Sequence, residues 1–200
     1  MGDYKLNYFR FAVSPTLEWY RTRNITDISE PAFGSILYCY LYGGVCEHSG
    51  IYVGNNEIVH LNGDGLVEKV NSKKFRKRLE GKNIATHIYV SCKGLTAVGS
   101  RKAGEIAIKL IGKQYNYSIT NFNCHAFTAL CFEEDIKSKS STSWHNKFIY
   151  LGSQHLPHYL HTTAMIAATC YGIYDSCANK YEHIAKTCID VDNWRIWDTK

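Results

Sequence analysis

The sequence predicts an α+β fold in which an antiparallel sheet packs on helices. Short runs rich in Ile, Leu, Val and Tyr, separated by turn signals, dominate the region before residue 91, and helical patterns follow them. A chain of 200 residues that is 45% apolar and 20% charged can bury one well-formed core. We therefore expect one globular domain, alone or with an appendage.

Five strands are expected before the helices. Gly43-Gly44, Gly54-Asn55-Asn56 and the run 62–65 provide turn signals between the first four of them. The expected strands are Ser35–Tyr42, Glu47–Val53, Glu57–Leu61, Leu66–Val70 and Ile84–Val90.

Two helices follow the strands. The first is expected over Thr96–Ile111, because its apolar residues recur on one helical face, and Gly112 is a plausible C-cap. The second begins near Cys124 and runs to about Glu134.

The chain divides into a core and two flanking parts. Residues 1–30 form a polar, aromatic N-terminal segment, and residues 31–136 form the core domain. The Ser- and Lys-rich run 137–143 reads as a flexible linker, and residues 144–200 are expected to form a helical extension.

Composition argues against several classes of protein. The N-terminus lacks an apolar signal core, and the apolar stretch 162–174 is too short for a membrane span. None of the eight cysteines forms a CxxC pair, so a zinc site of common spacing is not expected. These observations favour a cytoplasmic protein with reduced thiols and no metal.

The net charge of +5 owes much to one basic run, which contains Lys73, Lys74, Arg76, Lys77 and Arg78. Such a run most often forms a solvated face, and the next interpretation is contact with anionic lipid at a membrane surface. Nucleic acid ranks third, because no binding motif accompanies the run.

Cys124 is the candidate nucleophile. It follows a polar, irregular stretch and opens an apolar helical pattern, so it is expected in the first turn of a helix. Exposed amides and the helix dipole favour a thiolate there. Position alone would favour a small buried hydrophobe, since the chain has eight cysteines, and this is the interpretation we prefer for Cys131 and Cys46.

His48 and His60 occupy the two arms of the predicted hairpin around residues 54–56. A two-residue turn would direct them to opposite faces of the sheet. A three-residue loop or a bulge would make them diagonal neighbours on one face, close enough to share a pocket. The alternative is that each is an ordinary surface or core histidine.

Two sequence blocks resemble the lecithin:retinol acyltransferase family. The first is His48-Ser-Gly-Ile-Tyr-Val-Gly54 with a second histidine 12 positions after the first (60 − 48 = 12). The second comprises Leu110-Ile-Gly112, Tyr117, Thr120 and Asn123-Cys-His-Ala-Phe127, and the resemblance runs from about Pro31 to Glu134. It implies a permuted papain-like or NlpC-type fold, since the histidines precede the cysteine.

The resemblance implies cofactor-free acyl transfer through a thioester on Cys124, with a phospholipid as acyl donor and water or an amine as acceptor, which could belong to a protein. His48 would take the thiol proton, and His60 would fix the tautomer of His48. Backbone amides at the helix start, including that of Cys124, would hold the oxyanion. Asn123 is expected to cap the helix rather than to act in catalysis. His125 is either a supporting catalytic residue or an exposed one, and exposure is the preferred interpretation. The protein would then act at the periphery of a membrane.

The chain departs from the family pattern at two places. Ser49 replaces the usual Trp, and His125-Ala126 replaces Glu-His. The acyl donor is therefore open, and two alternatives stand beside acyl transfer from lipid: a cysteine peptidase or amidase of the same superfamily, and an inactive binding module.

Overall fold

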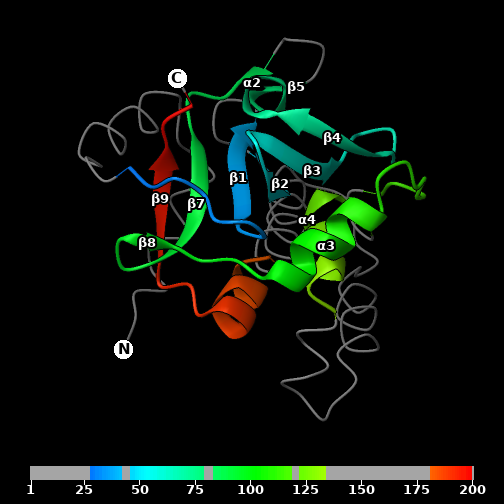
Figure 1. The fold of residues 1–200 in the computed structure, drawn as a ribbon. Coiled ribbons are helices and arrows are strands. Elements are labelled where there is room, and N and C mark those ends of the chain that lie inside the picture. The colour runs from blue at the N-terminus through cyan, green and yellow to red at the C-terminus, as the bar shows by residue number, and fades with distance from the viewer. Residues whose placement is uncertain (1–27, 42–45, 79–82, 119–121, 134–180, 200) are drawn as a thin grey trace, which may run out of the picture.

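The computed structural model describes residues 28–41, 46–78, 83–118, 122–133 and 181–199 (Figure 1). The expectations for residues 1–27 and 134–180, including the linker at 137–143 and the apolar stretch 162–174, lie outside these ranges. Among the described residues, no helix is both long enough and apolar enough to cross a membrane.

Within these ranges, seven strands form one sheet, in the order β4-β3-β2-β1-β7-β8, with β9 also paired to β7. Neighbouring strands run antiparallel. The strands are β1 (Ile36–Leu41), β2 (Cys46–Gly54), β3 (Glu57–Leu61), β4 (Val67–Asn71), β7 (Ile88–Lys93), β8 (Thr96–Ala97) and β9 (Asn193–Trp197).

Helices flank this sheet. They are α2 (Ser72–Arg76), α3 (Arg101–Lys109), α4 (Cys124–Cys131) and a helix at residues 181–189. Two short strands, β5 (Lys77–Arg78) and β6 (Asn83–Ile84), pair with each other beside α2. The predicted α+β class, with an antiparallel sheet packed on helices, is confirmed.

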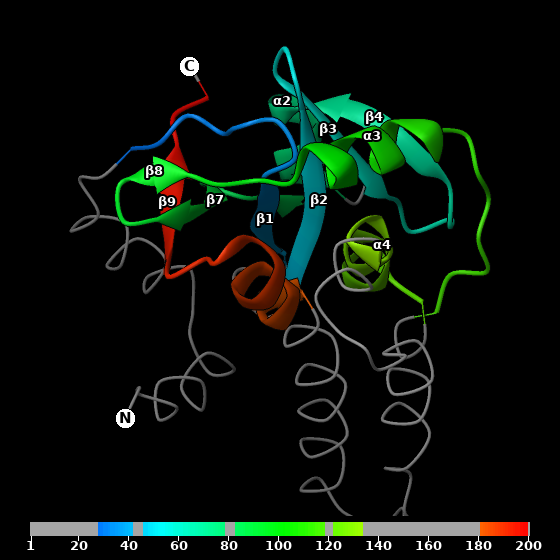
Figure 2. The ribbon, with the colours of Figure 1, turned by 60° about the horizontal axis from the view of Figure 1, so that its bottom comes forward.

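Both faces of the sheet are covered. Because successive side chains of a strand point to opposite faces, the strands contribute to two different cores. On one face, side chains of β1, β2 and β3 pack with α3, α4 and the helix at 181–189. Figure 2 shows where these helices lie relative to the strands. This core includes Tyr38, Ile51, Val59, Ala103, Phe127 and Ile184. The other core includes Leu37, Cys39, Ile58, Phe75 of α2, Ile88 and Trp197.

The β2–β3 hairpin has the parity that the histidine hypothesis requires. Asn55 and Asn56 both have positive φ, 52° and 59°, which suits a two-residue turn that pairs Gly54 with Glu57. A register shift between Tyr52 and Gly54 then pairs Ile51 with Val59. A bulge, rather than a three-residue loop, therefore turns both histidines to one face.

The Gly50→Ala variant is expected to be destabilised by about 1–3 kcal/mol through overpacking. An added Cβ would lie 2.9 Å from the backbone oxygen of Val59 and 3.1 Å from the Cβ of His60. Gly63→Ala is the control, because a Cβ there meets nothing within 4 Å. Urea unfolding of both variants measures the effect, and equal losses would contradict it.

Several element boundaries differ from the prediction. The strand expected at 84–90 is split, since residues 83–84 pair with β5 and β7 begins at Ile88. The first predicted helix begins later, at Arg101, because Ser100 caps it by accepting a hydrogen bond from the amide of Ala103. The helix ends at Lys109, and Gly112 lies beyond its end with φ of 84°.

The helical extension predicted for residues 144–200 is wrong in its last part. Residues 181–189 are helical, but β9 pairs along β7 from Ile88↔Trp197 to Cys92↔Asn193 and belongs to the main sheet. Ser29, at the start of the described residues, also contacts β9, since its amide donates to the carbonyl of Ile196 at 2.9 Å. The described end of the chain is thus part of the core domain.

Candidate active site

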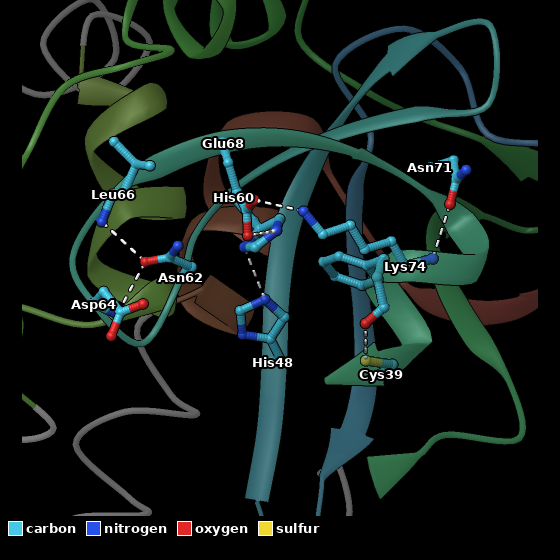
Figure 3. A network of polar contacts seen from close by, with 10 residues as sticks. Cys39, His48, His60, Asn62, Asp64, Leu66, Glu68, Asn71 and Lys74 are labelled. Carbon is cyan, nitrogen blue, oxygen red and sulfur yellow. Dashed lines mark hydrogen bonds and ion pairs between the residues drawn. The ribbon is translucent and has the colours of Figure 1, made fainter. Parts of the chain in front are cut away.

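The two histidines of the hairpin form a buried, hydrogen-bonded pair. Nε2 of His48 lies 3.2 Å from Nδ1 of His60, and the rings meet edge to face at 4.9 Å (Figure 3). His48 is 4% exposed and His60 is fully buried. The Phe75 ring packs against both, at 5.1 and 5.6 Å between centroids. The structure thus confirms that the two imidazoles lie on one face of the sheet and contact each other.

A carboxylate connects this pair to the surface. β3 and β4 pair His60 with Glu68, whose Oε1 lies 3.5 Å from Nε2 of His60. The other carboxylate oxygen of Glu68 accepts a hydrogen bond at 2.9 Å from the ammonium of Lys74 on α2 (Figure 3). Glu68 was not among the predicted site residues, although the turn signal at 62–65 places it on the strand next to His60.

Cys124 begins α4, as predicted. The Asn123 side chain accepts hydrogen bonds from the amides of His125 and Ala126, at 3.0 and 3.1 Å, which confirms its capping role. Cys124 itself is buried, with 5% of its surface exposed. The cap occupies two amides of the first turn, so these two are not donors to an oxyanion while the cap is in place.

The predicted exposure of His125 is wrong, because this residue faces the sheet and is 4% exposed. Its Nδ1 lies 2.8 Å from the hydroxyl of Ser49, and its ring stacks on Tyr181 at 4.8 Å. Ser49 also contacts the Thr128 hydroxyl at 2.9 Å, and Thr128 donates to the carbonyl of Cys124 at 3.0 Å. These contacts fix the first turn of α4 against β2.

Tyr181 extends this network to a buried carboxylate. Its hydroxyl donates to Oε2 of Glu47. Complete burial, together with the Glu47 charge, raises the pKa of Tyr181 well above its usual value, so the phenol remains protonated and acts as a donor. Sequence reasoning missed both residues, since nothing in a separation of 134 positions signals their contact.

The structure does not show the expected three-residue triad. Successive residues of β2 point to opposite faces, and Ser49 contacts α4 while its neighbour His48 packs on Phe75 of α2. The histidine pair therefore lies on the face opposite α4. The structure brings the two imidazoles together, and it places Cys124 at the capped start of α4. The histidine pair and α4, however, lie on different sides of the sheet.

The remaining candidates fall into two groups. Cys131 is 1% exposed, and burial raises the pKa of its thiol strongly, which confirms a packing role. In the basic run, Lys73, Lys74 and Lys77 are exposed, while half-buried Arg76 donates to the carbonyl of Thr86 at 3.3 Å. The side chain of Arg78 lies outside the description.

Within the described ranges, no three His, Cys, Asp or Glu side chains are grouped so that they could hold a metal ion. No family model matches the chain, and no curated protein matches it in sequence.

Proposed function

We propose that this protein catalyses cysteine-dependent acyl transfer, with Cys124 as the nucleophile and the buried pair His48–His60 as the proton acceptor. The observation that carries the proposal is the contact of 3.2 Å between two buried imidazoles, a costly arrangement that suits a general base with an orienting partner. The N-terminal position of Cys124 on α4 favours a thiolate. A permuted papain-like fold is part of the proposal.

In the proposed reaction, the Cys124 thiol gives its proton to His48, and the thiolate attacks the ester carbonyl of a glycerophospholipid. The new C–S bond forms, the ester C–O bond breaks, and the leaving alkoxide takes the proton from His48. Water or an amine then releases the acyl group and returns a proton to the sulfur. Because α4 and the pair contact different faces of β2, the proposed reaction requires a rearrangement that brings the sulfur of Cys124 to His48.

The exposed cations beside the pair support a lipid donor. Lys73, Lys74 and Lys77 lie on or next to α2, the helix whose Phe75 packs on the histidines. Lysines at such a position attract anionic head groups. The proposed site of action is accordingly the surface of a membrane.

We expect the full chain, incubated with vesicles of diacyl glycerophospholipid, to gain the mass of one fatty acyl group on Cys124. Intact-protein mass spectrometry detects the adduct, peptide mapping locates it, and hydroxylamine should remove it as a thioester. A peptide or amide substrate cleaved without any lipid adduct would favour a peptidase or amidase.

The separation of α4 from the histidine pair favours a second candidate, a binding module without catalysis. In such a module, the pair would only stabilise the hairpin, and α4 would serve the core through Phe127. The absence of an acyl adduct and of amide cleavage would support this module over both enzymes.

A further inference from the structure

We propose that Glu68 is a positioning residue that sets the tautomers of both buried imidazoles and leaves Nδ1 of His48 as the basic nitrogen. This inference deepens the proposed function and rests on it for its catalytic meaning. The arrangement of protons that it assigns can be measured in the resting protein, without any reaction.

The contacts form a series from the interior to the surface. His48 and His60 are buried, while the Glu68 side chain is 21% exposed and the Lys74 side chain 62% exposed. The distances along the series are 3.2 Å between the rings, 3.5 Å from His60 to Glu68 and 2.9 Å from Glu68 to Lys74. Phe75 packs on both rings and contributes no polar atom from its side chain.

The series determines where the protons lie when both imidazoles are neutral. An ionised carboxylate only accepts hydrogen bonds, so its contact of 3.5 Å with Nε2 of His60 favours a proton on that nitrogen. Neutral His60 then has its lone pair on Nδ1, which accepts from Nε2–H of His48. Nδ1 of His48 is left with the lone pair.

This arrangement can take up a proton without rearranging. If Nδ1 of His48 is protonated, His48 still donates from Nε2 to His60, and His60 still donates from Nε2 to Glu68. A base whose partners are already oriented avoids reorganisation during proton transfer. The ammonium of Lys74, which donates to the other carboxylate oxygen of Glu68 at 2.9 Å, holds this carboxylate beside His60.

A second ion pair on the same two strands provides a matched control. Lys69 of β4 contacts Glu57 of β3 at 2.8 Å, and the two side chains are 42% and 38% exposed. Loss of Glu57 therefore removes a surface ion pair without touching the imidazoles, while loss of Glu68 removes an ion pair together with the acceptor of His60.

The test uses histidine labelled with ¹⁵N and long-range proton–nitrogen spectra of the full chain, recorded above the pH at which the pair protonates. In wild type, both rings should be Nε2–H tautomers. In Glu68→Met, a near-isostere without an acceptor, a large fraction of His60 should convert to Nδ1–H. Glu68→Gln should retain the wild-type tautomers through its amide oxygen, and Glu57→Met should leave them unchanged.

Unchanged tautomers in Glu68→Met, or an Nδ1–H tautomer of His60 in wild type, would overturn the inference. The same spectra in a Cys124→Ala background separate the inference from the proposed chemistry. A tautomer shift in Glu68→Met, together with no acyl adduct on the chain that retains Cys124, would retain the role of Glu68 and refute acyl transfer. Adduct formation at the wild-type rate by Glu68→Met, with unshifted tautomers, would do the reverse.

Discussion

Replacing His48 with Gln is expected to slow acylation of Cys124 by a factor of about 10²–10⁴, the usual contribution of a general base. The Gln amide can still donate a hydrogen bond to Nδ1 of His60, so the variant removes the base and keeps the packing of the pair. The rate is measured as the growth of the acyl adduct by mass spectrometry at fixed lipid concentration.

The same experiment decides whether the sheet separates the base from the nucleophile during the reaction. His87→Gln is the control, because the ring of His87 is bound to its own neighbour Thr86 at 2.9 Å and belongs to neither network. If His48→Gln and His87→Gln both acylate at the wild-type rate, then Cys124 does not use the histidine pair. The pair would then have a structural role, as the faces of β2 suggest.

Local signals in the sequence predicted the hairpin but left open which face each histidine occupies. A two-residue turn at Asn55-Asn56 would by itself place His48 and His60 on opposite faces, and the bulge that brings them together was a condition of the functional hypothesis that the register now confirms. The cap on α4 was predictable from local signals, since Asn123 and the amides that it binds lie within three residues of each other.

The environment of Cys124 was not predictable from local signals. The helix that carries Cys124 is short, and its own apolar residues lie on more than one of its sides. The sequence therefore does not indicate which face of the sheet this helix covers. That choice depends on contacts such as Ser49 with His125 and Tyr181 with Glu47, which join residues 76 and 134 positions apart. The position of β9 beside β7 depends on distant pairing in the same way.

Replacing Phe75 with Ala is expected to lower the free energy of unfolding by about 3–5 kcal/mol. Phe75 is fully buried, it fills the space beside both imidazoles, and no other described aromatic ring is in contact with both of them. Its backbone carbonyl accepts the contact from the Cys39 thiol at 3.7 Å, and this contact does not depend on the side chain. The loss therefore reports on the packing of Phe75 against the two imidazoles and against the apolar residues of its core, such as Leu37 and Ile58. Urea unfolding followed by circular dichroism measures it.

The Phe75→Leu variant tests whether the loss of stability in Phe75→Ala comes from the lost side-chain volume. Leu retains much of the buried volume, so the expected loss is roughly 1.5 kcal/mol or less. In Phe75→Ala, by contrast, the cavity is bordered by polar imidazole nitrogens and can admit water, which would compete for the contact between His48 and His60. An Ala variant that loses less than about 1 kcal/mol would mean that the pair is supported by the strands alone. Since α2 also carries Lys74, the partner of Glu68, this result would mean that α2 affects the pair through the Lys74–Glu68 contact and not through the packing of Phe75.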